Sequence, residues 1–96
     1  MSSKSGLRKW HPLKLNYSTR ALDDLRKISK IYLEKQAMQI TEAFSRFAET
    51  GMADVRPFRR LDKGLELRVG RFRAILQIED GIVSMVVVGM KKSQKI

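Results

Sequence analysis

Residues 65–88, LELRVGRFRAILQIEDGIVSMVVV, decide the fold of this chain. Apolar and polar side chains alternate over residues 65–69 and again over residues 72–78. Alternation with a period of two predicts strands that each keep one face in contact with water. Gly70, between the two runs, permits a tight turn. The stretch therefore opens with two neighbouring antiparallel strands.

The next signal is the dipeptide Asp80-Gly81, which is typical of a two-residue β-hairpin loop. The run that follows, residues 82–88, is apolar at almost every position. Such a run predicts a central strand buried on both faces. A short extended or loop segment at residues 55–58 precedes these strands, so we expect three or four strands in a meander.

The first half of the chain has helical periodicity. Residues 13–17 alternate as a short strand, and Ser18 is a suitable helix cap. Apolar residues then recur at helical spacing until Thr50-Gly51 supplies a stop. One straight helix of that length would be long for so small a domain, so we expect a break near Ser29–Tyr32 and a helical hairpin.

These elements predict an α+β fold, in which an N-terminal strand and a helical hairpin pack on a small twisted antiparallel β-sheet. Ninety-six residues suffice for one domain. We expect residues 1–12 to be a basic flexible tail and residues 13–96 to form a single domain.

The composition excludes several classes of site. The chain has no cysteine and one histidine, His11, which excludes disulfides, thiolate metal sites and a cysteine nucleophile. We therefore expect neither a metal nor a cofactor. No apolar run approaches the roughly 20 residues of a membrane-spanning helix, and the N-terminus lacks the apolar stretch of a secretory signal. The cytoplasm is the expected compartment.

Positive charge is the strongest compositional feature. Twenty Lys and Arg against ten Asp and Glu give a net charge of +10. Residues 56–73 hold seven basic and two acidic side chains, which leaves +5 in eighteen positions. A field of this kind attracts nucleic acid or an acidic protein. Charge alone also permits a plain solvated sheet face, with Glu66 paired to Arg68 or Arg73 across strands.

Several short motifs occur here in a familiar order. They are Tyr17-Ser18-x-Arg20-Ala21-x-x-Asp24-Leu25, Glu66-Leu67-Arg68, Gly70-x-x-Arg73, an acidic turn, an apolar strand that ends in Val88-Gly89, and a basic tail. In this order and spacing they resemble the RelE/ParE superfamily of toxins from type II toxin–antitoxin systems. The resemblance covers roughly residues 13–95. The tail Lys91-Lys92-Ser93-Gln94-Lys95 is similar to the phage-derived HigB-like branch.

The resemblance implies a compact α+β toxin that binds a cognate antitoxin protein and contacts operator DNA only as the toxin–antitoxin complex. For the RelE and HigB-like branches it also implies a ribosome-dependent endoribonuclease, an mRNA interferase. In that reaction the RNA 2′-hydroxyl attacks the adjacent phosphate without a metal. It requires a proton acceptor, a proton donor and cations around the transition state.

The resemblance also assigns residues. Arg73, Arg68 and Lys91 match catalytic positions, with Arg73 expected to stabilise the phosphate. Positions expected to bind RNA are Arg59, Arg60, Lys63, Arg71, Lys92 and Lys95. RelE-like nucleases often carry an aromatic or histidine acid–base group in the C-terminal tail, and residues 91–96 contain neither. A lysine or Glu66 would then have to move the protons.

Two alternatives remain open. One is a non-enzymatic ParE-like toxin that inhibits DNA gyrase or another type II topoisomerase by binding it, and the absence of a terminal aromatic favours this option. The other is a basic nucleic-acid-binding module without toxicity.

Overall fold

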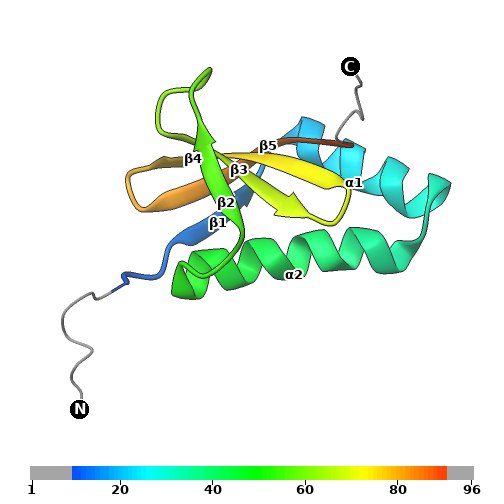
Figure 1. Cartoon of the computed structure of the whole chain (residues 1–96), viewed down its shortest axis with the longest axis horizontal. Coiled ribbons are helices and arrows are strands. Elements are labelled where there is room, and N and C mark those ends of the chain that lie inside the picture. Colours follow the sequence, from blue (N-terminus) through cyan, green and yellow to red (C-terminus); the bar gives the residue numbers. More distant parts are fainter. Residues whose placement is uncertain (1–9, 91–96) are drawn as a thin grey trace, which may run out of the picture.

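The computed structural model describes residues 10–90, which form five strands and two helices (Figure 1). In chain order these are β1 (Lys14–Tyr17), α1 (Thr19–Ile31), α2 (Glu34–Thr50), β2 (Val55–Phe58), β3 (Gly64–Val69), β4 (Phe72–Glu79) and β5 (Ile82–Met90). The predicted α+β class and order of elements are confirmed. The segment at residues 55–58, left open between strand and loop, is a strand.

The sheet is mixed and not purely antiparallel. Its strand order is β1-β5-β4-β3-β2. Strands β2 to β5 form the predicted antiparallel meander, but β1 lies parallel to β5 at the edge. Two parallel strands need a long crossover connection, and the segment from α1 to β4 forms the connection between β1 and β5. The antiparallel part of the prediction therefore holds for four of the five strands.

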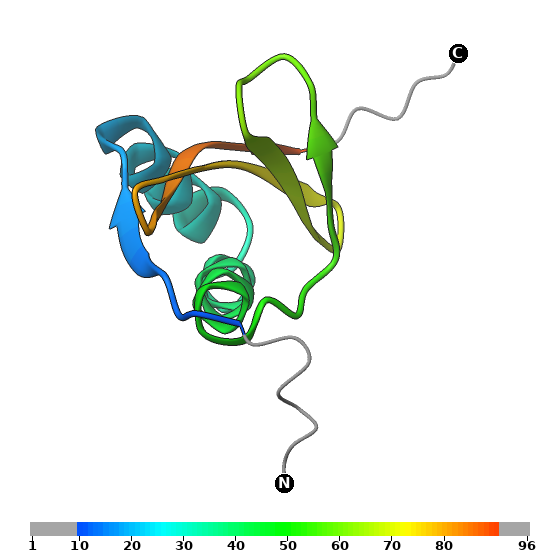
Figure 2. The same cartoon turned by 90° about the vertical axis from the view of Figure 1, so that its left-hand side faces the viewer.

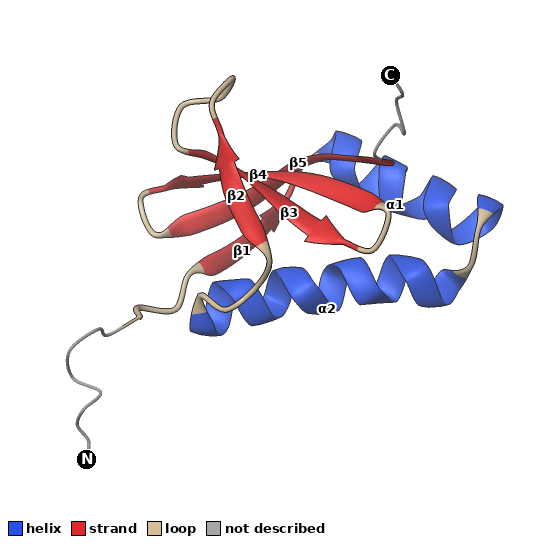
Figure 3. Ribbon diagram, viewed as in Figure 1, coloured by secondary structure: helices blue, strands red, loops and turns tan. Residues whose placement is uncertain are grey.

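Both helices cover the same face of the sheet (Figures 2 and 3). The core lies between these two layers and includes Phe44, Ile40, Leu67, Leu76 and Met85, each fully buried. The opposite face, called the outer face below, carries no helix. No helix within residues 10–90 is long and apolar enough to cross a membrane.

Strand β5 corrects one prediction. It is an interior strand, but β4 is the central one, and β5 is buried only on the face toward the helices. Val83, Met85 and Val88 are buried, whereas Ile82 is 38% exposed and Val87 is half-buried. Because both helices pack on one face, the apolar run leaves part of its surface on the outer face.

The helix boundaries follow local signals. Ser18 caps α1, and its Oγ accepts a hydrogen bond from the Ala21 N–H at 2.9 Å, as predicted. The predicted break occurs after Ile31, where the extended Leu33 turns the chain into α2. Helix α2 ends at Gly51, whose φ of 77° lies in the left-handed region that glycine adopts without strain.

Two side chains from the start of α1 tie it to β5. Strand β5 carries a bulge at Val86 and continues beyond the end of β1. The Ser18 Oγ donates to the Val86 carbonyl at 2.7 Å, and an Asp24 carboxylate oxygen accepts from the Val88 N–H at 3.0 Å. These two bonds occupy edge groups of β5 that β1 is too short to reach.

The first described residue also contacts the fold. Trp10 falls within the expected basic tail, and it packs on the C-terminal end of α2. Its indole N–H donates to the Ala48 carbonyl at 2.9 Å, and its ring meets Phe47 edge-on at 5.5 Å. A Cβ on Gly51 would lie 2.6 Å from this ring. The residue that ends α2 therefore also leaves room for Trp10.

The tie between Asp24 and β5 can be measured. We expect Asp24→Ala to lower the free energy of unfolding by about 1–3 kcal/mol, because the Val88 N–H loses its partner. Urea denaturation measures the change. Asp23→Ala is the matched control: Asp23 is 54% exposed and, among residues 10–90, pairs only with Lys27, so a change of about 0.5 kcal/mol or less is expected. Equal effects of the two substitutions would contradict the assignment.

Tyr17 gives the fold a pH dependence. Its ring meets Phe44 edge-on at 5.1 Å, and burial raises its pKa above the usual value of 10.0. The unfolded chain loses this proton at a lower pH than the folded chain does. The contribution of Tyr17 to the free energy of unfolding is therefore fully present below about pH 10, and it decreases as the pH rises through the pKa of the folded state. In alkaline titrations of unfolding, Tyr17→Phe should flatten this fall, and an unchanged slope would exclude Tyr17 as its source.

Candidate functional site

Two arginines face each other on the outer face of the sheet. Arg68 of β3 is the cross-strand partner of Arg73 of β4, and Arg73 is in turn the partner of Gly89 on β5. Directly opposed side chains have their Cβ atoms about 4.5–5.5 Å apart. Like charges at that separation repel, and an anion placed between them would relieve the repulsion.

The two guanidinium groups differ in their partners. The Arg68 Nε lies 3.3 Å from a Glu66 carboxylate oxygen, so this pair lies along one strand and not across two. The Arg73 Nη1 donates to the carbonyls of Gly70 and Phe72 at 2.8 and 2.9 Å. Within residues 10–90 no carboxylate forms an ion pair with Arg73. Its charge is held in place but not neutralised.

The surroundings of this pair are open and basic. A Cβ on Gly89 would meet no atom within 4 Å, so nothing covers the sheet beside Arg73. The exposed Arg71 lies in the β3–β4 turn at the same end of the sheet. The half-buried Ile75 and Val87 are cross-strand partners in the next row of the outer face. The site thus combines cations with an apolar platform.

The sequence places Arg56 among the basic residues 56–73 but assigns it no role at the site. This exposed residue of β2 is the cross-strand partner of Glu66, which places it on the outer face next to the Arg68 row. The alternating pattern of a strand at residues 55–58 would have revealed it. Interpreting those residues partly as a loop removed that information.

The basic loop between β2 and β3 lies elsewhere. Arg59, Arg60 and Lys63 precede Gly64, the first residue of β3, whereas Arg68 is near its last. Four residues of strand separate Gly64 from Arg68, roughly 13 Å. Figure 1 shows this loop and the β3–β4 turn at opposite ends of β3. The structure therefore places Arg59, Arg60 and Lys63 away from Arg68 and Arg73.

Lys91, Lys92 and Lys95 lie outside the described residues. Strand β5 ends at Met90, which is the cross-strand partner of Phe72. The last described residue, Met90, therefore lies at the end of the sheet that carries Arg68, Arg71 and Arg73. The predicted roles of the three lysines stay predictions.

Tyr32 approaches the same end of the sheet from the helical side. It follows α1 in the turn between the helices, and its ring meets Phe72 edge-on at 5.5 Å. Its hydroxyl lies 3.8 Å from the Met90 sulfur. The Phe72 side chain thus contacts the Tyr32 ring, and the Phe72 carbonyl accepts a hydrogen bond from Arg73. The position of Tyr32 in the helical part of the sequence did not indicate that it would contact Phe72 and Met90.

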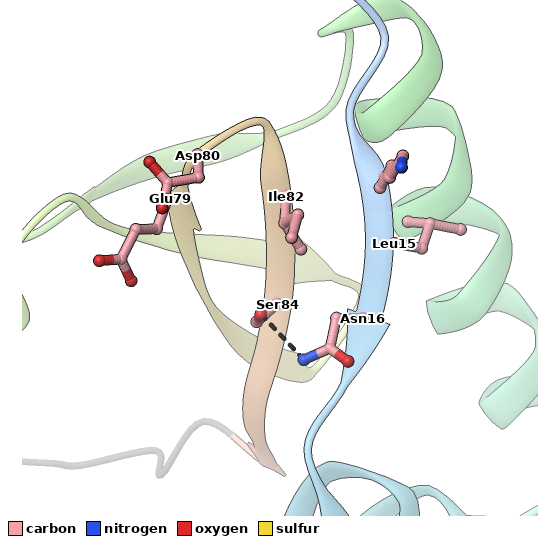
Figure 4. Close-up of a pocket in the computed structure, with 7 residues that line it drawn as sticks. Leu15, Asn16, Glu79, Asp80, Ile82 and Ser84 are labelled. Carbon is pink, nitrogen blue, oxygen red and sulfur yellow. Dashed lines mark hydrogen bonds between the residues drawn. The ribbon is translucent and has the colours of Figure 1, made fainter.

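The outer face also has a pocket away from the two arginines (Figure 4). This pocket of about 430 Å³ lies beside the β4–β5 turn and is bordered by Glu79, Asp80, Lys14 and Asn16. The Asn16 amide donates to Ser84 at 3.0 Å across its floor. Two carboxylates at its rim repel a phosphate, so the arginine end is the better anion site.

Known structures share this arrangement. RelBE2 of Mycobacterium tuberculosis, a toxin–antitoxin complex, matches with a TM-score of 0.64 and 24% identity, over 84% of this chain and 100% of that one. The chain has the RelE/ParE fold. E. coli RelE, solved as a mutant in the free state, matches with a TM-score of 0.68 and 18% identity, over 83% of this chain and 84% of that one.

A ParE-type structure is similar to the same degree. The chromosomal ParDE system of P. aeruginosa gives a TM-score of 0.64 at 15% identity, over 86% of this chain and 100% of that one. No protein-family model and no curated protein sequence matches the chain. The predicted fold is thus confirmed, while the HigB-like branch is not singled out.

The arginine end should bind RNA in a salt-dependent way. Each phosphate contact on a single strand contributes a slope of about −0.7 to the dependence of log affinity on log salt. We expect Arg73→Ala to make this slope shallower by about 0.7 for a short single-stranded RNA. Fluorescence anisotropy across a salt series measures it. Arg26→Ala, which removes an exposed charge from α1, should leave the slope unchanged; equal slopes for the two variants would reject the arginine site.

Proposed function

We propose that this protein is the toxin of a type II toxin–antitoxin pair and cleaves mRNA on the ribosome. The observation that carries the proposal is the opposed pair Arg68 and Arg73, of which Arg73 has no carboxylate partner within residues 10–90. The similarity of the fold to RelE supports it.

The proposed reaction is attack of a 2′-hydroxyl on the neighbouring phosphate. Negative charge grows on the phosphate oxygens in the transition state, and preorganised cations stabilise it. Arg73 suits this role because two carbonyls already fix its guanidinium, so little reorganisation is needed when the charge develops. Arg68 supplies a second cation whose charge Glu66 partly balances.

An antitoxin is the proposed protein partner. The RelBE2, ParDE and DinJ–YafQ structures are toxin–antitoxin systems or complexes, and their toxins share this fold. A chain with a net charge of +10 favours an acidic partner. A segment that covered Arg68 and Arg73 would neutralise the repelling pair and block RNA at the same time.

The test is growth arrest together with transcript mapping. We expect induced expression of the chain in a bacterium to stop growth and to produce new 5′ ends inside translated codons, which vanish when translation is blocked. Arg73→Ala should reduce cleavage by about 10²–10³, the usual loss for one transition-state donor. Arg26→Ala, at matched expression, should remain toxic.

The ParE-like alternative is supported by the ParDE structure, whose TM-score of 0.64 is close to the 0.68 of RelE. Arrest without new 5′ ends, accompanied by a DNA-damage response, would favour inhibition of a topoisomerase. Full toxicity of Arg73→Ala with intact cleavage would reject the assigned site. No arrest at all would reject both toxin proposals.

A further inference from the structure

The proposed reaction lacks an assigned proton donor. Cleavage forms a bond between the 2′-oxygen and phosphorus and breaks the bond from phosphorus to the 5′-oxygen. The 5′-oxygen must gain a proton as it leaves, and the 2′-hydroxyl must lose one. Arginine stays charged in proteins and does not supply this proton. Arg68 and Arg73 therefore do not complete the site.

Tyrosine and histidine side chains can supply it, and the chain has few of them. The chain has two tyrosines and one histidine. Tyr17 is packed edge-on against Phe44 between the sheet and α2. His11 lies between Trp10 and Leu13, both of which bond to the Ala48 carbonyl at the C-terminal end of α2. Neither is at the arginine end of the sheet.

Tyr32 is at that end. Its ring rests on Phe72, and the Phe72 carbonyl holds the Arg73 guanidinium at 2.9 Å. Phe72 thus contacts both Tyr32 and Arg73. The arginine lies on the outer face at this end of the sheet, and the tyrosine lies on the helical face. The Arg73 guanidinium also donates to the Gly70 carbonyl in the β3–β4 turn, so a phosphate that it binds would lie at the end of the sheet, where the two faces meet.

The Tyr32 hydroxyl is also free to act. A tyrosine hydroxyl in a packed position usually finds a strong acceptor. Within the described part of the chain its sole partner is the Met90 sulfur, at 3.8 Å, and a thioether is a weak acceptor. The side chain is 37% exposed, so a ligand can reach it. Nothing strong competes for its proton.

We propose that Tyr32 is the general acid that protonates the departing 5′-oxygen, an inference that rests on the proposed function. The attacking and leaving oxygens lie on opposite sides of the phosphorus, so their proton acceptor and donor should also lie on opposite sides. Glu66, 3.3 Å from Arg68 on the outer face, takes the proton of the 2′-hydroxyl. Tyr32 gives one to the 5′-oxygen from the helical side.

The protons and bonds of this step balance. The products are a 2′,3′-cyclic phosphate and a 5′-hydroxyl. The proton that Glu66 gains equals the one that Tyr32 loses, and water returns it between turnovers. No metal, oxidant or further reactant enters the step.

The experiment compares Tyr32→Phe with the unchanged chain in single-turnover cleavage of an mRNA bound to ribosomes. Phenylalanine keeps the ring on Phe72 and removes only the hydroxyl. We expect a fall of about 10²–10⁴ in the cleavage rate. Tyr17→Phe is the matched control and should cleave as the unchanged chain does. Circular dichroism would confirm that both variants are folded.

A second substrate separates a proton donor from a structural role. In it, sulfur replaces the bridging 5′-oxygen at the cleavage site, and a thiolate leaves without being protonated. We expect Tyr32→Phe to cleave this RNA as fast as the unchanged chain does. Equal losses on both substrates, or normal cleavage of the ordinary mRNA by Tyr32→Phe, would overturn the role of Tyr32 and leave the nuclease proposal standing. Absence of cleavage by the unchanged chain would overturn both.

Discussion

The bonds from Ser18 and Asp24 to the backbone of β5 are the constraint on which the rest of the structure depends. Strand β1 stops at Tyr17, while β5 continues to Met90 with a bulge at Val86. Unpaired backbone N–H and C=O groups at a strand edge destabilise the fold when they are buried, and they can pair with another chain when they are exposed. The start of α1 satisfies the Val86 carbonyl and the Val88 N–H. Because those bonds fix α1 along β5, they also fix where the turn after α1 delivers Tyr32.

The outer face has a second constraint, which is electrostatic. Its two ends differ in sign: Arg68, Arg71 and Arg73 lie near the β3–β4 turn, and Glu79 with Asp80 lie near the β4–β5 turn. Opposed arginines cost stability in the free protein, since like charges across strands repel. An anion bound between the two arginines would remove this cost, and the outer face, which no helix covers, is open to such a ligand.

Local signals predicted most of the elements, and long-range contacts escaped prediction. The Ser18 cap, the stop at Gly51 and the Asp80-Gly81 turn depend on residues a few positions apart, so the sequence displays them directly. The parallel pairing of β1 with β5 joins residues 68 positions apart, and the contact of Tyr32 with Met90 joins residues 58 apart. No periodicity encodes those partners. The same limit applies to the basic residues between positions 56 and 73, because a run of charge does not show that Arg59 and Arg73 lie at opposite ends of β3.

The two faces of the sheet have different roles, because one carries the core and the other carries the candidate site. The helical face holds the whole of the buried core, including Phe44, Leu67 and Leu76, so the outer face contributes little to stability. Charged residues can gather there without disturbing the packing. Phe72 is the exception, because its side chain belongs to the core while its carbonyl holds Arg73. Packing of the helical hairpin on Phe72 thereby sets the position of the site, and the geometry of the arginine end follows from the same contacts that hold the domain together.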